Sequence, residues 1–210
     1  MKLYTSRFAP NPRRVTIFLA EKRIEVPTVE VDLAKKENLL PDFLARNPLG
    51  RVPVLEFDDG TYLTESVAIC RYFEATHPEP ALFGTGARAQ ANVEMWNRRM
   101  EFEILANVTA CFRNTHPYWE GRIEQVPEFG ELCRRTLEGR MEWLDGEIAG
   151  RPFIAGERFT IADITAVTAF DLGKVARIRI PESLSNLTAW YARVSALPSV
   201  ASTSPTRKDG

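Results

Sequence analysis

The sequence predicts an α/β domain with a mixed β-sheet, followed by an all-helical domain. Three observations support this organisation. Strand-like and helix-like segments alternate near the N-terminus, a stretch rich in proline and glycine follows at 76–86, and helical periodicity then continues to about residue 200. A chain of 210 residues is long enough for two small domains, each with its own core.

The N-terminal segment is predicted to form a strand, a helix, a second strand and a short helix. A strand is expected at 2–6, and Pro12 suits the first turn of the next helix, where a missing N–H is tolerated. Residues 28–33 alternate valine and leucine with acidic residues, as in a strand with one buried face. A short helix is expected at 41–46, ended by the turn at 47–50.

The clearest local pattern is VPVLEFDDGTYLTES at 52–66. Two strand-like runs flank Asp59-Gly60, a dipeptide that suits a tight hairpin because glycine tolerates positive φ. An amphipathic helix begins at about Ser66. The resulting order, βαβαββα, combines a parallel βαβ unit with an antiparallel hairpin, which is the thioredoxin-like arrangement.

The helical part is predicted from the spacing of its apolar residues, with helices over 87–114 and 126–149. In the second of these, Phe129 and Leu132 are among the residues placed on the apolar face. Another helix begins at Thr160, which can cap it while Asp163 reaches back from the third helical position. A last helix has apolar residues at i, i+3, i+4 and i+7: Leu187, Trp190, Tyr191 and Val194.

These patterns also set the predicted boundaries. Residues 1–77 form the thioredoxin-like domain, 78–86 the linker and 87–200 the all-helical domain. The polar segment at 201–210 is predicted to be a disordered tail.

Composition excludes several classes of function. Basic and acidic side chains number 27 and 28, a balance that argues against nucleic-acid binding. No apolar run reaches the ~20 residues of a membrane span, and the N-terminus has no apolar segment of a secretory signal. We therefore expect a cytoplasmic protein that binds neither nucleic acid nor membranes.

Cysteine and histidine positions predict no metal centre. Cys70, Cys111 and Cys133 are far apart in helical patterns, so we expect buried apolar side chains rather than disulfides or zinc ligands. His77 and His116 each precede a proline in loop-like sequence, without clustered acids.

The junction between the first strand and the first helix is FAPNPRRV at 8–15. Such junctions present backbone N–H groups to anionic ligands in many α/β proteins. This one has two prolines and two arginines but no nucleophilic side chain. The segment therefore predicts a site where a ligand is held closely, but it does not identify the atom that reacts.

Three segments make the chain similar to the glutathione transferase superfamily from residue 1 to about 200. They are NPLGRVPVL at 47–55, LTESVAI at 63–69 and GERFTIADI at 156–164. The chain resembles bacterial, theta- or nu-like members, except that Ala9 stands where serine or cysteine is usual. The resemblance implies glutathione as a substrate and no metal.

The resemblance also implies a set of glutathione ligands. Pro53 matches the family's cis-proline, which turns the backbone of Val52 toward the cysteinyl part of glutathione. Ser66 and the helix start match the binding site of the γ-glutamyl carboxylate, a site that a helix N-terminus favours. Glu65 matches the acceptor for the α-amino group.

The glycyl carboxylate is expected to meet Arg51 or Asn38. Each implied ligand also has an ordinary structural interpretation from the residues alone. Pro53 could be a trans proline at the start of a strand, Ser66 a helix-capping residue, and Arg51 a solvated side chain.

The resemblance implies that the reactive species is the thiolate of glutathione, whose free thiol has a pKa of ~8.5. Ala9 has no donor for it. We expect Asn11 and the helix start to hold the thiolate, with Ser6 assisting. The alternatives are a turn asparagine and an edge-strand serine.

The second substrate is expected between the first loop and the helical domain. Its candidate pocket residues, each of which would also suit a core, are Phe8, Phe112, Tyr118 and Trp119. Arg13 and Arg14 are expected on the exposed side of the first helix.

Three functions remain open. The leading one is the conjugation of glutathione to small hydrophobic electrophiles in detoxification. The alternatives are a glutathione-dependent disulfide or peroxide reductase, and a ligand-binding or interaction module without turnover, which Ala9 favours. The resemblance also implies a homodimer.

Overall fold

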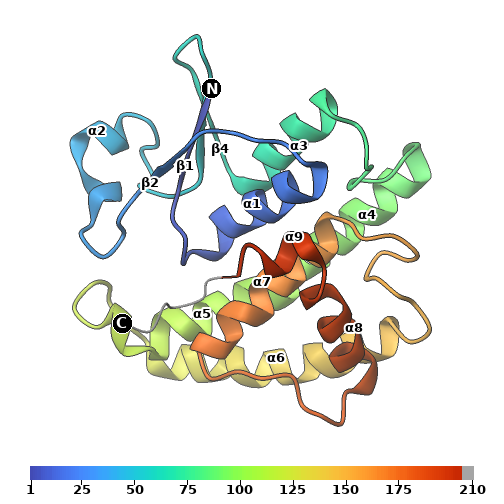
Figure 1. The fold of residues 1–210 in the computed structure, drawn as a ribbon. Coiled ribbons are helices and arrows are strands. Elements are labelled where there is room, and N and C mark those ends of the chain that lie inside the picture. The colour runs from blue at the N-terminus through green and yellow to red at the C-terminus, as the bar shows by residue number, and fades with distance from the viewer. Residues whose placement is uncertain (205–210) are drawn as a thin grey trace. The chain divides into compact units, whose positions relative to one another are not determined.

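The computed structural model describes residues 1–204 and divides the chain into two units (Figure 1). The first unit contains Met1–Ala81 together with the chain from Pro198, and the second is Leu82–Leu197. The C-terminal segment therefore joins the first unit, rather than ending the helical domain at residue 200. Within the predicted tail, residues 201–204 follow or end a short helix, and residues 205–210 lie outside the described part.

The first unit is built on a four-stranded mixed sheet with the order β2-β1-β3-β4. β2 is parallel to β1, whereas β1–β3 and β3–β4 are antiparallel. The strands are β1 (Lys2–Thr5), β2 (Thr28–Glu30), β3 (Val54–Glu56) and β4 (Tyr62–Thr64). The thioredoxin-like prediction is confirmed, including a hairpin at Gly60, whose φ of 81° suits glycine.

Helices cover both faces of this sheet. α1 (Pro10–Lys22) and α3 (Ser66–Thr76) pack together on one side (Figure 1). The 3₁₀ turn η1 (Glu37–Leu39) and the short α2 (Pro41–Leu44) lie on the other side. A final helix, α9 (Pro198–Ala201), packs against α1.

Core side chains alternate between the two faces, as the two-residue period of a strand requires. Leu3 and Leu55, which are paired across β1 and β3, are fully buried on one face of the sheet. Ala9 and Leu33 pack against a cluster of buried residues on the opposite side. This cluster consists of Tyr4, Val31, Phe43, Val52 and Val54. The loop before α1 and the loop before β3 therefore share one apolar support.

The strand predicted over 28–33 is shorter in the structure. Only Thr28–Glu30 pairs with β1, and Val29 is exposed. β2 is an edge strand with a neighbour on one side only. The alternation of apolar and acidic residues in the sequence extends beyond the residues that pair with β1. Val31, one residue past the strand, is buried in the core.

The prediction that Arg13 and Arg14 lie on the exposed side of α1 is wrong. Arg13 is 5% exposed and Arg14 is 1% exposed. Arg13 donates hydrogen bonds to the carbonyl oxygens of Val200 and Thr203 in the C-terminal segment. Arg14 donates to the hydroxyl of Ser66. Acceptors distant in the sequence thus permit two guanidinium groups on a buried helix face.

The second unit is helical. Its helices are α4 (Ala87–Arg99), α5 (Ala106–Thr115), α6 (Pro127–Glu147), α7 (Ile161–Val175) and α8 (Ser185–Ser195). The helix predicted over 87–114 contains a π-helical segment, η2 (Met100–Leu105), and the 3₁₀ turn η3 (Pro117–Trp119) follows α5. Most of α7 is buried, which makes it the central helix of this unit.

Phe129 and Leu132 were predicted on the apolar face of α6, but both are exposed. The buried stripe of α6 instead includes Gly130, where α5 approaches closely. A Cβ at Gly130 would come within 2.5 Å of the Thr115 side chain. Because glycine has no side chain, α5 and α6 can approach each other closely at Gly130.

The capping box predicted at the start of α7 is confirmed. The carboxylate of Asp163 accepts hydrogen bonds from the Thr160 N–H at 3.0 Å and from the Thr160 hydroxyl at 3.1 Å. It also accepts from the Ile154 N–H and the Trp190 indole N–H, both at 2.9 Å. One fully buried carboxylate therefore ties the preceding loop and α8 to α7.

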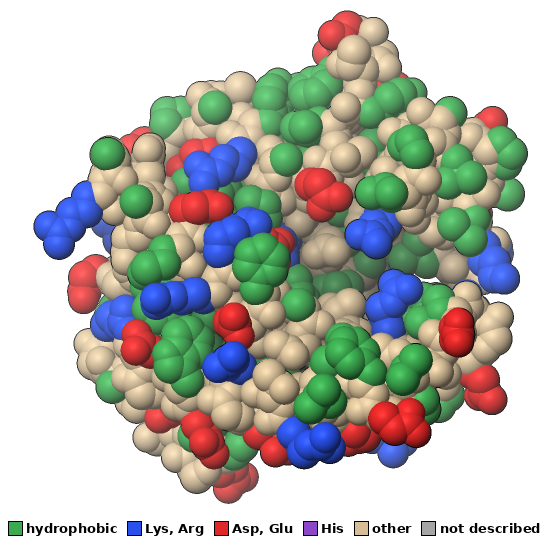
Figure 2. Space-filling model, turned by 180° about the vertical axis from the view of Figure 1, so that it is seen from behind, with side chains coloured by type: hydrophobic (Ala, Val, Ile, Leu, Met, Phe, Trp, Pro, Cys, Tyr) green, Lys and Arg blue, Asp and Glu red, His purple; other side chains and the backbone are tan. Residues whose placement is uncertain are grey.

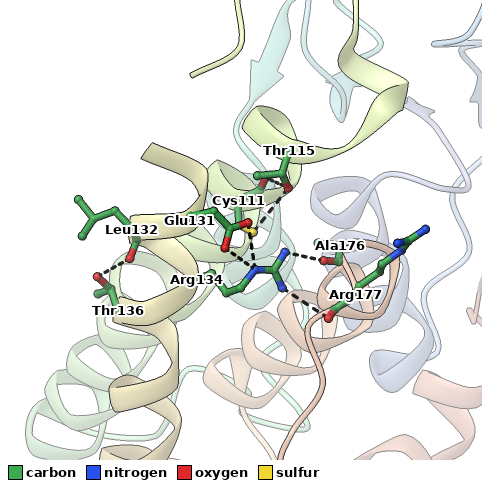
Figure 3. Close-up of polar contacts among 8 residues, drawn as sticks. All are labelled: Cys111, Thr115, Glu131, Leu132, Arg134, Thr136, Ala176 and Arg177. Atoms are coloured by element: carbon green, nitrogen blue, oxygen red, sulfur yellow. Dashed lines mark hydrogen bonds and ion pairs between the residues drawn. The ribbon is translucent and has the colours of Figure 1, made fainter. Parts of the chain in front are cut away.

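The guanidinium group of Arg134 caps the C-terminal end of α7 (Figure 3). Arg134 of α6 donates to the carbonyl oxygens of Ala176 at 3.3 Å and Arg177 at 3.5 Å. Its Nε lies 3.2 Å from the carboxylate of Glu131. These carbonyls follow the last turn of α7, where backbone acceptors have no partner within the helix and a cation is favoured.

We expect Arg134→Met to lower the free energy of unfolding by about 1 kcal/mol, because the partly exposed cap is lost while the aliphatic packing is kept. Urea unfolding followed by circular dichroism measures this change. Arg135→Met is the matched control, since Arg135 is exposed on the same helix and its loss should change stability by less than about 0.5 kcal/mol. Equal effects of the two substitutions would contradict the cap.

Charge is mixed on the molecular surface. On the face drawn in Figure 2, basic and acidic side chains are interspersed, in keeping with 27 basic and 28 acidic residues in the whole chain. Among the described residues, no helix combines the length and apolar character needed to cross a membrane.

Candidate functional site

Three predicted segments of the site meet at one edge of the sheet. β1 and β3 are antiparallel, so the C-terminal end of β1 lies beside the N-terminal end of β3. β4 is antiparallel to β3, and Thr64 at its end pairs with Val54. The loop at 6–9, the loop at 50–53 and the start of α3 at Ser66 therefore lie close together.

The loop before β3 has an open backbone edge at Val52. The Val52–Pro53 peptide bond is cis, as expected from the resemblance. Within residues 1–204, neither the N–H nor the C=O of Val52 has a hydrogen-bond partner, while its side chain is buried in the core cluster. A backbone held by its side chain with both polar groups free can pair with an extended ligand.

Two asparagines hold this loop in shape. Asn47 is buried, donates to the Arg51 carbonyl at 2.8 Å and accepts from the Leu49 N–H. Asn38 donates to the Gly50 carbonyl at 2.7 Å. The Asn38 amide thus supports the loop backbone, whereas the Arg51 side chain is exposed. Asn47 was not predicted as part of the site; its place in the NPLG turn was the only signal.

The start of α3 offers donors to an anion. Ser66 is the first helical residue and is buried, and Glu65 before it is exposed with a φ of 68°. A positive φ is uncommon for a residue with a side chain and marks a backbone held in place by its surroundings. The N–H groups of Ser66 and Val67 have no partner among residues 1–204, as expected in a first helical turn.

The first turn of α1 has few available donors. Pro10 and Pro12 have no N–H, the Ala9 N–H donates to Ser6, and the Arg13 N–H donates to Ala9. Asn11 is exposed, and within the described chain neither its backbone N–H nor its side-chain amide is hydrogen-bonded. The donors that this turn can offer to a ligand therefore come from Asn11.

Ala9 and Ser6 flank this turn. Ala9 packs against the core cluster that also contains Val52, so its methyl group has a structural role. Ser6 is buried at the end of β1, and its hydroxyl has no partner among residues 1–204. Both residues lie at the same edge of the sheet as Val52.

The predicted aromatic residues fall in two units. Phe8, in the first unit, is 67% exposed. In the second unit, Phe112, Tyr118 and Trp119 form one cluster, with ring centroids 5.1–6.4 Å apart. The guanidinium of Arg113 lies 4.7 Å from the Trp119 ring. This cluster presents aromatic faces beside a cation, a setting that suits planar ligands.

The three cysteines are free and buried. Burial raises the pKa of the Cys70 thiol far above its usual range and also raises that of Cys133. Thiols with raised pKa values are poor nucleophiles. No cluster of three or more potential metal ligands occurs among the described residues.

A thioredoxin-like domain with a cis-proline loop beside a helix start, continued by an all-helical domain, is the fold of the glutathione transferases. Models described as the N-terminal and C-terminal domains of glutathione S-transferase match residues 3–81 and 104–198. The chain therefore belongs to the glutathione S-transferase family.

Individual relatives agree. Glutathione S-transferase 2 of Saccharomyces cerevisiae is 36% identical over 95% of this chain and 88% of its own length. GstA of Escherichia coli O157:H7 is 30% identical over 88% of each chain. The crystal structure of Gtt2 from Saccharomyces cerevisiae superposes with a TM-score of 0.92 at 36% identity, covering 97% of this chain and all of that one.

Proposed function

We propose that this protein conjugates the thiolate of glutathione to small hydrophobic electrophiles. The observation that carries the proposal is the arrangement at one edge of the sheet. An open backbone at Val52 lies there with the anion-binding start of α3 and with Asn11, which holds the unpaired donors of the first turn of α1. In this proposal, these three elements bind the cysteinyl residue, the γ-glutamyl carboxylate and the sulfur of one tripeptide.

Each group has a distinct task in this proposal. Val52 pairs its N–H and C=O with the cysteinyl residue, which fixes the direction of the peptide. Ser66 and the first-turn N–H groups of α3 bind the γ-glutamyl carboxylate, and Glu65 accepts from the α-amino group. Arg51 binds the glycyl carboxylate in this proposal, and Asn38 supports the loop by its hydrogen bond to the Gly50 carbonyl.

Asn11 stabilises the sulfur as a thiolate. Its side-chain and backbone N–H groups donate to the anion, with the positive end of α1 and the Ser6 hydroxyl assisting. Loss of the thiol proton to solvent leaves a sulfur lone pair that attacks the electrophilic carbon. A carbon–sulfur bond forms as a leaving group departs or as a π-bond opens.

Two alternatives have a specific observation behind them. Ala9 favours a ligand-binding or interaction module without turnover, because the usual donor to the glutathione sulfur is missing. A glutathione-dependent disulfide or peroxide reductase would have to use bound glutathione alone, since Cys70, Cys111 and Cys133 are buried.

The electrophile is proposed to be aromatic or otherwise apolar, and the candidate residues for it are Phe8 of the first unit and Phe112, Tyr118 and Trp119 of the second. We further propose a homodimer acting in the cytoplasm in detoxification. Neither nucleic acid, membrane nor metal has a part in this function.

Calorimetric titration with glutathione, followed by the ultraviolet absorbance of the thiolate against pH, tests the proposal. Saturable binding together with a bound-thiol pKa below the ~8.5 of the free thiol is the expected result. Binding without a change in the pKa of the thiol would favour the binding module instead. Absence of binding at millimolar glutathione would contradict the transferase and the glutathione-dependent reductase.

A further inference from the structure

A buried ion lies beneath the start of α3. The guanidinium Nη1 of Arg14 donates to the Oγ of Ser66 at 3.2 Å, and the two residues are only 1% and 4% exposed. Removing a guanidinium from water is unfavourable, and such groups are found where they meet acceptors or other charges. Arg14 and Ser66 are 52 residues apart, so the contact joins α1 to α3.

This hydrogen bond restricts the directions in which the serine hydroxyl can donate. A hydroxyl group has one proton and two lone pairs, and the Arg14 N–H occupies a lone pair of Ser66. The proton of Ser66 is therefore free to donate to a further acceptor. A donor polarised by a cation forms a stronger bond to a carboxylate than an isolated hydroxyl does.

The positive charge of Arg14 also acts within α3. Burial raises the pKa of the Cys70 thiol, and the charge of Arg14 works in the opposite direction. Cys70 lies one turn after Ser66, so Arg14 adds to the positive potential that the helix dipole already creates at this end.

We propose that Arg14 is a positioning residue for the carboxylate site, acting through Ser66. Its guanidinium orients the Ser66 hydroxyl toward the α-carboxylate of the γ-glutamyl residue and makes the site selective for a negative charge. The inference rests on the proposed function, because it assumes that glutathione places this carboxylate at the start of α3.

Arg13 provides a matched control. It is the neighbouring residue on α1 and is also buried, but it donates to the backbone of the C-terminal segment at Val200 and Thr203. Arg13→Met and Arg14→Met each remove one buried guanidinium and keep an unbranched apolar side chain. A purely structural effect should be similar in the two variants.

The test is a titration of three proteins with two ligands: glutathione, and its analogue in which the γ-glutamyl α-carboxylate is a carboxamide. We expect Arg14→Met to weaken glutathione binding about tenfold or more, as for loss of a charge-assisted hydrogen bond. Binding of the analogue should change less than about threefold, because the group that Arg14 serves is absent. Arg13→Met should leave the ratio of the two affinities unchanged.

An equal loss for both ligands in Arg14→Met would overturn the inference while leaving the proposed function intact. If that variant does not fold, Arg14→Lys keeps the charge with a shorter reach, and the same criterion applies: the loss must be larger for glutathione than for the analogue. No binding of glutathione by the unaltered protein would overturn the proposed function and this inference together.

Discussion

Asn11→Ala should lower kcat/KM at pH 7 by about tenfold to a hundredfold, which corresponds to the loss of one hydrogen bond to a charged group. The pKa of bound glutathione should rise by about one to two units, because a charge-assisted hydrogen bond favours the thiolate by that amount. The backbone N–H of residue 11 remains in this variant, so some activation should survive. Thiolate absorbance against pH and steady-state kinetics measure both quantities.

Asn11→Asp distinguishes this role from that of a turn residue. Asparagine and aspartate have similar preferences in turns and early helical positions, so a purely structural Asn11 would tolerate the exchange. A donor to sulfur would not, because a carboxylate repels the thiolate and should raise its pKa further than alanine does. Full turnover in either variant, with an unchanged thiol pKa, would rule out the assigned role.

The parts of the site that could be predicted are those contained in one short segment. Pro53 and Ser66 lie in short patterns that carry the resemblance, whereas the residues alone also allow a trans proline and a helix-capping serine. Asn11 was proposed from the junction between a strand and a helix, together with the resemblance. The structure was needed to show that Asn11 carries the unpaired donors of this turn, because this depends on which neighbouring N–H groups already form hydrogen bonds.

The burial of Arg14 could not be predicted, because it depends on a partner that is distant in the sequence. Periodicity treats arginine as polar and assigns it to the exposed face. Ser66 and the C-terminal segment supply acceptors that reverse this assignment for Arg14 and Arg13. Burial of a charged residue is thus decided by tertiary contacts that no local pattern contains.

The fold was predicted where turn chemistry and periodicity agree. Asp59-Gly60 marks a hairpin, and the Thr160–Asp163 spacing marks a helix start; both are present in the structure. Elements at the margins were less predictable. Phe129 is exposed although apolar, because the close approach of α5 at Gly130 sets which face of α6 is buried.

Asp163→Ala should lower the free energy of unfolding by about 3 kcal/mol or more at pH 7, the usual range for loss of a buried, hydrogen-bonded charge. The substitution leaves buried donors of Thr160, Ile154 and Trp190 without their acceptor. Chemical unfolding followed by tryptophan fluorescence measures the loss. Asp42→Ala is a suitable control, because Asp42 is exposed and should contribute less than about 0.5 kcal/mol.

The contribution of Asp163 to stability should also depend on pH in a characteristic way. Burial raises the pKa of Asp163 from 3.8 to about 6, against the opposing effect of its hydrogen bonds. The folded state therefore binds this proton more tightly than the unfolded state does, and the cost of burying the carboxylate falls as the pH is lowered from 7 to 4. The free energy of unfolding of the unaltered protein, relative to that of Asp163→Asn, should therefore rise over this interval by up to about 3 kcal/mol. A difference that stays constant or shrinks on acidification would show that the carboxylate keeps its charge in the folded protein.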